Sequence, residues 1–329
     1  MNDMPDQAAL NPVRLAAREI FPPGTISPEA RQALSAGAAM PAMPRPAVDD
    51  IEGWRKAVVA SDAMWGPMAD QMLAATGSEI ETRTIEGVTC YVSVPRGCDE
   101  KRGPLYLYFH GGAMVFGGGK VAKAFGASTA DRLGMVTVSV DYRMPPDHPF
   151  PAAPEDCVAV YRGLIASHDP ARIAIGGVSA GGNLAAAAAL MIRDRGLPQP
   201  AAVLLLTPEV DLTEAGDTFR TNEWLDTTLK TTLPETNALY AAGHDMTDPY
   251  VSPLFGDFSK GFPPTFIQSG TRDLFLSNSV LMHRKLRNAG LEAELHVWEA
   301  MPHGGFGFGD APENREISEE VKRFIARHV

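Results

Sequence analysis

Short, almost wholly apolar segments recur along this chain of 329 residues, and longer segments with helical character separate them. A strand is apolar throughout when both faces of its sheet are covered, and parallel neighbours need a crossover connection, usually a helix. The repeated order therefore predicts an α/β fold in which helices cover both faces of a largely parallel sheet. The apolar segments are "PLYLYFH", "MVTVSVDY", "ARIAIGGVS", "AAVLLLTP", "PTFIQSG" and "AELHVWEA". Helices are expected near residues 121–133, 152–167, 181–193, 278–289 and 314–328.

The first strands of this sheet have a different pattern. From about Glu79, "EIETRTIEG" and "VTCYVSVP" alternate between polar and apolar residues in the manner of a hairpin. They bring the expected sheet to eight strands, within a single domain whose core covers about residues 77–208 and 263–329.

Two regions do not fit the alternation. Residues 1–76 show helical pieces broken by prolines, including "SPEARQALSAG" with its Ser-Pro capping signal. Residues 209–262 are rich in Thr, Asp and Pro and lack a strong strand pattern. Because a structureless loop of that length is uncommon in a compact domain, we expect an insertion that forms short helices of its own.

The composition excludes several classes of partner. The chain carries 29 Lys and Arg against 40 Asp and Glu, a net charge of −11, so no surface for nucleic acid or an anionic membrane is expected. The three cysteines do not form a recognisable pattern. Cys90, Cys98 and Cys157 are odd in number and lack Cys-x-x-Cys spacing, which argues against a disulfide framework or a zinc site. No clustered ligand set indicates a metal or an organic cofactor. Neither a secretory signal nor a membrane-spanning apolar stretch is recognisable, so a cytoplasmic location is the default expectation.

The pentapeptide "GVSAG", residues 177–181, lies directly between the strand "ARIAI" and an alanine-rich helix. A Gly-x-Ser-x-Gly sequence in this context is typical of a nucleophile elbow, a tight turn that exposes a serine at a helix N-terminus. The glycines are needed because side chains would collide with the packed strand and helix. Glycine-rich turns of this kind also bind phosphates, so the strand and helix around it, more than the pentapeptide, favour Ser179 as a nucleophile.

A serine hydroxyl needs a base, and the base needs an orienting carboxylate. His303 in "EAMPHGGFGFG" follows the last expected strand on a glycine-rich turn, and we predict that it is the base. Asp273 in "PTFIQSGTRDLF" follows the preceding strand and is the favoured acid, because the order Ser, Asp, His is that of α/β-hydrolases. Asp211 and Glu209 in "TPEVDLT" are rival acids.

The segment "HGGAMVFGGG" offers amides for an oxyanion. It follows the strand "PLYLYF", so the backbone N–H groups of Gly112 and Ala113 can turn toward Ser179, and the amide of Ala180 can complete the oxyanion hole. His110 is expected to anchor this loop by hydrogen bonds and not to transfer protons.

With these parts in place, the sequence resembles the hormone-sensitive lipase family of α/β-hydrolase esterases. The resemblance implies the catalytic roles of Ser179, Asp273 and His303 and the oxyanion amides of Gly112, Ala113 and Ala180. It also implies a helical cap over the site, built from about residues 1–76 and about 209–262, and makes a homodimer plausible. The segments that carry it are "HGGA", "DYRMPPDHPFPAAPEDC", "GVSAGGN", "YVSPLFGDF", "GTRDLF" and "MPHGGF".

Two residues depart from the family pattern. Ala113 stands where a third glycine is usual, so its added methyl group makes esters of tertiary alcohols less suitable substrates. Val178 replaces the usual Asp or Thr before the nucleophile, which removes a polar side chain that can brace the loop. Neither change removes a catalytic group. Candidates for an apolar substrate pocket, although such residues more often pack in the core, are Trp54, Trp65, Met68, Met114, Phe116 and Trp224.

These residues predict a serine carboxylesterase that hydrolyses short- to medium-chain esters of small molecules through an acyl-enzyme. A lactone hydrolase with the same triad is a close alternative. A catalytically silent small-molecule receptor on the same fold is an alternative of another class, and retention of His303 argues against it. Peptidase or amidase action is disfavoured because no added propeller or charged specificity pocket is recognisable.

Overall fold

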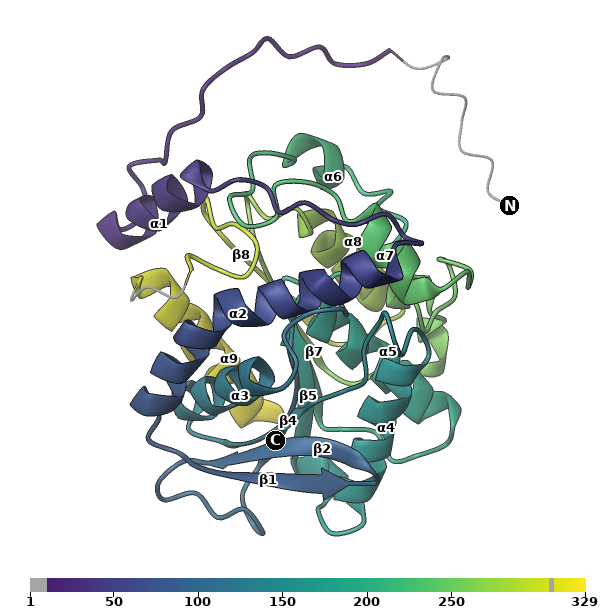
Figure 1. The fold of residues 1–329 in the computed structure, drawn as a ribbon. Coiled ribbons are helices and arrows are strands. Elements are labelled where there is room, and N and C mark those ends of the chain that lie inside the picture. The colour runs from purple at the N-terminus through teal and green to yellow at the C-terminus, as the bar shows by residue number, and fades with distance from the viewer. Residues whose placement is uncertain (1–10, 308–310) are drawn as a thin grey trace.

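The computed structural model describes residues 11–307 and 311–329, and an eight-stranded sheet forms its centre (Figure 1). The strand order is β1-β2-β4-β3-β5-β6-β7-β8, and β2 runs antiparallel to both of its neighbours while the other pairs are parallel. The prediction of a mostly parallel α/β sheet that opens with a hairpin is confirmed. The strands are β1 (Glu79–Ile85), β2 (Val88–Val94), β3 (Leu105–Phe109), β4 (Val136–Val140), β5 (Ile173–Val178), β6 (Ala202–Leu206), β7 (Thr265–Gly270) and β8 (Ala293–Trp298).

Helices cover both faces of the sheet, as the apolar strands require. One face packs against α4 (Ala152–Ile165), α5 (Ala180–Asp194) and α8 (Leu276–Asn288), and the other against α3 (Lys120–Leu133) and α9 (Pro312–His328). Strand β3 illustrates why a strand covered on both faces is apolar throughout. Leu105, Leu107 and Phe109 enter the first core, whereas the alternate residues Tyr106 and Tyr108 enter the second.

The two regions outside the alternation form helices and turns. The first region contains α1 (Pro28–Ala39) and α2 (Ile51–Ala75), and its residues 1–10 lie outside the described part of the chain. The second contains α6 (Thr218–Thr221) and α7 (Pro234–Ala241), followed by the 3₁₀ turns η3 (Pro253–Phe255) and η4 (Phe258–Lys260). In Figure 1, α1, α6 and α7 lie at the upper end of the molecule as drawn. The cap that these regions were expected to form stays a prediction.

Helix α1 begins at the expected serine and packs beside the last strand. The Ser27 hydroxyl accepts a hydrogen bond from the Ala30 N–H at 3.1 Å, and Pro28 occupies the first helical position. Ala30 and Leu34 are buried against Met301 and Phe306, in the loop that follows β8. The N-terminal helix therefore covers the loop that carries His303.

The three cysteines are free, and Cys90 and Cys157 are buried in the core. Burial raises the pKa of the Cys90 thiol to about 12, so this thiol is unreactive at neutral pH. Within residues 11–307 and 311–329, no helix combines the length and the apolar character needed to cross a bilayer.

Candidate active site

Ser179 lies at the turn between β5 and α5 in a backbone conformation that residues other than glycine rarely adopt. Its backbone has φ 60° and ψ −122°, and its N–H donates to the carbonyl oxygen of Leu206 on the neighbouring β6 at 2.9 Å. The turn brings the start of α5 so close to the end of the neighbouring β3 that a Cβ on Gly181 would run into the carbonyl oxygen of Phe109. This is the geometry of a nucleophile elbow, and it explains why glycine stands at that position.

Asp273 and His303 come from the loops after β7 and β8 and meet beneath the surface. The Nδ1 atom of His303 lies 3.0 Å from Oδ1 of Asp273, and the two side chains are buried. Asp273 also accepts hydrogen bonds from the Ser269 hydroxyl at 2.6 Å and from the Phe275 N–H at 2.9 Å. A carboxylate with these donors accepts the Nδ1 proton of the imidazole, so Nε2 keeps a lone pair for a serine hydroxyl.

The loop after β3 lies against the serine. A Cβ on Gly111 would come within 2.9 Å of the Val178 carbonyl oxygen and 3.5 Å of the Ser179 Cβ, so the two turns are in direct contact. Gly112 and Ala113 both have positive φ, 124° and 51°. Amides in such consecutive turn conformations can point to one side, where an oxyanion would need them.

His110 holds this loop in place. Its ring stacks on Tyr142 with centroids 4.1 Å apart, and Nδ1 lies 2.9 Å from the Gly111 carbonyl oxygen. The Tyr142 hydroxyl donates to the His110 carbonyl oxygen at 2.7 Å. Complete burial is the main cause that lowers the pKa of His110, so the ring is neutral and suited to anchoring.

Known proteins share both the sequence pattern and this architecture. A family model described as alpha/beta hydrolase fold matches residues 106–307. An acetyl-hydrolase from Streptomyces hygroscopicus is 33% identical over 226 residues, which cover 68% of this chain and 75% of that protein. The crystal structure of an esterase called E25 matches 97% of this chain and all of its own, with 33% identity and a TM-score of 0.88. An esterase from the bacterial hormone-sensitive lipase family matches 92% of this chain and 98% of its own, with 30% identity and a TM-score of 0.78.

The chain belongs to the α/β-hydrolase family. The fold predicted from the alternating segments and the resemblance to hormone-sensitive lipase esterases are both confirmed.

Among the described residues, the carboxylates of the two rival acids of this α/β-hydrolase form no hydrogen bond with His303. Asp211 accepts from the N–H and the hydroxyl of Thr213 at 3.0 and 2.6 Å, so its carboxylate stabilises a local turn. Glu209 is fully buried, and neither of its carboxyl oxygens has a hydrogen-bond partner of normal geometry among the described groups. Its backbone N–H lies 3.3 Å from the Ser179 carbonyl oxygen.

The candidates for a pocket wall fall in different places. Met114 is 1% exposed in the main core, and Trp65 packs between α2 and α3. Phe116 packs near Trp54 with centroids 6.3 Å apart, and Trp224 is 66% exposed. Met68 is half-buried on α2. Of these candidates, Trp54 and Phe116 are brought into contact, and a common pocket wall stays a prediction.

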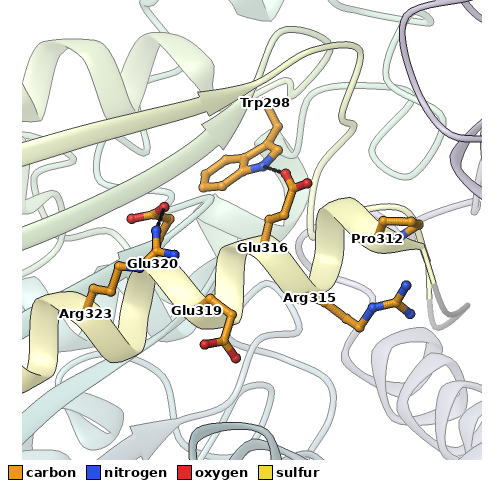
Figure 2. A pocket seen from close by; sticks show the side chains of 7 residues that line it. All are labelled: Trp298, Pro312, Arg315, Glu316, Glu319, Glu320 and Arg323. Carbon is orange, nitrogen blue, oxygen red and sulfur yellow. Dashed lines mark hydrogen bonds and ion pairs between the residues drawn. The ribbon is translucent and has the colours of Figure 1, made fainter.

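Two cavities are lined by residues other than Ser179, Asp273 and His303. Figure 2 shows a pocket of about 420 Å³ between Trp298, at the end of β8, and charged side chains of α9. There the indole N–H donates to Glu316 at 3.4 Å. A second cavity, of about 340 Å³, lies between α2 and residues 115–121 and is also lined by Asp62 and Asp141. Neither is lined by Ser179, Asp273 or His303, and Ser179 and His303 are themselves only 8% and 6% exposed.

One buried carboxylate beside the triad was not predicted. Asp226 lies between α6 and α7, and Oδ2 accepts hydrogen bonds from the Leu274 N–H at 2.8 Å and from the His303 N–H at 3.1 Å. Burial and then the charge of Asp273 raise the pKa of Asp226 to about 6. The polar surroundings "NEWLDTTLK" give no sign of burial, and the only local signal is the Asp-Thr-Thr turn pattern. In the described residues, no group of three or more His, Cys, Asp or Glu side chains is arranged to hold a metal ion.

Proposed function

We propose that this protein is a serine carboxylesterase in which Ser179 is the nucleophile, His303 the general base and Asp273 the orienting acid. The relatives' names support the ester-hydrolase class, because they include an esterase from Acinetobacter venetianus and a carboxylic ester hydrolase from Mycobacterium tuberculosis. The observation that carries the assignment of residues is the 3.0 Å contact between His303 Nδ1 and Asp273 Oδ1 at the sheet edge that also presents the strained Ser179.

The reaction follows from this arrangement. Nε2 of His303 takes the hydroxyl proton as Ser179 Oγ attacks the carbonyl carbon of an ester. The tetrahedral oxyanion accepts hydrogen bonds from the N–H groups of Gly112, Ala113 and Ala180. His303 then gives its proton to the departing alcohol, which leaves an acyl group on Ser179. Water, deprotonated by the same histidine, attacks this acyl-enzyme and releases the acid.

A small substrate with a short acyl group suits the site best. Ser179 and His303 are almost completely covered, so a large acyl chain would require more movement than an acetyl group. The acetyl-hydrolase from Streptomyces hygroscopicus among the relatives supports the same choice.

The test compares wild type with Ser179→Ala on p-nitrophenyl esters of increasing acyl length. Turnover should be highest for short chains and fall by at least about 10³-fold in the variant, because the nucleophile is absent. A fluorophosphonate should label wild type and leave Ser179→Ala unlabelled. The mass of the labelled peptide should place the adduct on Ser179.

Two outcomes would replace the proposal. Faster turnover of a lactone panel than of the open-chain esters would make the protein a lactone hydrolase with the same triad. Ester binding without hydrolysis, together with no labelling by the fluorophosphonate, would make it a receptor on the hydrolase fold.

A further inference from the structure

Asp226 connects the two loops that carry the acid and the base. Oδ2 accepts from the N–H of Leu274, the residue after Asp273, and from the N–H of His303 itself. Oδ1 accepts from the N–H groups of Thr228 and Leu229 at 2.8 and 3.0 Å, which fixes the carboxylate on its own segment. A single buried side chain thus joins the loop after β7, the loop after β8 and the segment between α6 and α7.

A second contact from the same segment reaches the acid loop. The Asn222 side-chain Nδ2 donates to the carbonyl oxygens of Asp273 at 2.8 Å and Thr271 at 3.2 Å. The Asp226 N–H donates to the Asn222 carbonyl oxygen at 2.9 Å, so the two side chains belong to one hydrogen-bonded turn. This turn is buried at both residues, with Asp226 0% and Asn222 6% exposed. The position of the loops after β7 and β8 is therefore fixed from the side of the insertion, residues 209–262.

Packing alone does not require a charge at Asp226, because a neutral hydrogen-bond acceptor could fill the same place. Its carboxylate lies next to that of Asp273, and two like charges in a buried site oppose each other. Charge-assisted hydrogen bonds to backbone N–H groups are shorter and stronger than neutral ones, so the two from Leu274 and His303 hold the loops more firmly than an amide or hydroxyl would, while the two from Thr228 and Leu229 fix the carboxylate itself. The same charge favours the imidazolium that forms when His303 accepts the serine proton.

We propose that Asp226 is a positioning residue for the hydrolysis reaction, which sets the separation and orientation of Asp273 and His303 by binding the backbone of both loops. This role rests on the proposed function. It makes the segment between α6 and α7 a part of the catalytic apparatus, although that segment contributes no group to the reacting atoms.

The decisive variants are Asp226→Asn and Asp226→Ser, assayed on p-nitrophenyl acetate. Each removes the charge and at least one backbone hydrogen bond, so kcat should fall about 10- to 100-fold while KM changes less than about threefold. The low-field proton resonance of His303 Nδ1–H should shift or broaden in both variants. Asp248→Asn is the control, because Asp248 lies in the same insertion, residues 209–262, and its carboxylate accepts from the Tyr250 N–H at 2.8 Å, outside the loops after β7 and β8. It should keep the wild-type kcat and resonance.

Hydrogen exchange in the wild type tests the contacts without a variant. The amides of Leu274 and His303 should exchange as slowly as those of β5. Fast exchange at both would show that the bonds to Asp226 do not persist, and a folded Asp226 variant with wild-type kcat and an unchanged resonance would reduce the residue to a structural role. Either result overturns the proposal. Absence of ester turnover and of fluorophosphonate labelling in wild type would instead reject the proposed function, while exchange and the resonance still report on Asp226.

Discussion

Single residues around Ser179 are held in strained backbone conformations by their neighbours. Ser179 and Ala113 both have positive φ, 60° and 51°, which costs on the order of 1–3 kcal/mol for a residue with a side chain. Ala113 packs against a buried cluster of Phe219, Leu233, Leu274 and Phe275, and the Phe275 ring lies edge-on to His303 with centroids 4.8 Å apart. The residue that replaces the family's third glycine is therefore stabilised by an apolar cluster to which the loop after β7 contributes.

Substitution of the two candidate carboxylates tests which of them orients His303. Asp273→Asn should reduce kcat by about 10³- to 10⁴-fold, because an amide can favour the wrong tautomer of His303 and cannot stabilise its charged form. Asp211→Asn should stay within about threefold of wild type, because Asp211 binds only Thr213 through its carboxylate. Steady-state kinetics of both variants on one ester show which carboxylate orients His303. A larger loss of kcat in Asp211→Asn than in Asp273→Asn would make Asp211 the acid.

The proposed triad residues could be predicted from the sequence, whereas Asp226 could not. Asp273 and His303 each follow an apolar strand, and parallel strands deliver such residues to one edge, so their meeting could be predicted. Asp226 follows no strand and stands in a polar stretch. Its place depends on how the insertion folds back over the sheet, and a local pattern does not specify that long-range packing.

Helix α1 shows how an element far from the triad in sequence supports it. Ser27 binds Glu313 of α9 through its N–H at 2.7 Å and its hydroxyl at 2.8 Å, and Leu34 is 1% exposed against the loop that carries His303. The Ser-Pro signal predicted where α1 begins, because capping is local. The surface against which α1 packs was not predictable. An amphipathic pattern shows that one face of a helix is buried, but it does not show which part of the protein covers that face.

Removing the buried side chain of α1 should weaken both stability and catalysis. Leu34→Ala leaves a cavity beside Met301 and Phe306 and should lower the free energy of unfolding by about 2–5 kcal/mol. Because the cavity borders the His303 loop, kcat should fall as well. Urea unfolding and ester turnover measure the two effects, with Val59→Ala, at a 69% exposed position of α2, as the control. A Leu34→Ala protein as stable as this control would show that α1 does not pack as described.

The molecule as a whole is acidic, and it buries several carboxyl groups on the side of the triad. Glu209, Asp226 and Asp273 are 0% exposed, although the net charge is −11. Burial disfavours the charged form of an acid, so a buried carboxyl without compensating donors binds its proton more tightly in the folded state than in the unfolded state. The global stability of this protein must therefore depend on pH, and the dependence arises close to the nucleophile.

Glu209 should dominate that dependence. Burial first, and then the charge of Glu214, raise its pKa from the ordinary 4.5 to about 8. Below about pH 4.5 the group is protonated in both states and has no effect. Between these two pKa values only the unfolded state loses the proton, so the free energy of unfolding falls as pH rises, by up to about 1.4 kcal/mol per pH unit, and the full penalty is reached above about pH 8.

Glu209→Gln removes this titration while keeping the size of the side chain. The free energy of unfolding of the variant minus that of wild type should increase steadily between about pH 5 and pH 8 and stay constant above that range. This expectation holds whether the variant is more or less stable than wild type at pH 5. Urea unfolding at each pH measures the difference, and subtraction removes the contributions of other groups that titrate alike in both proteins, including Asp226. Glu79→Gln, at an exposed position of β1, is the control for exchanging a carboxyl for an amide without burial. A difference for Glu209→Gln that does not change with pH would mean that the carboxyl is charged in the folded protein and has a partner there, because only a compensated charge keeps an ordinary pKa at a fully buried position.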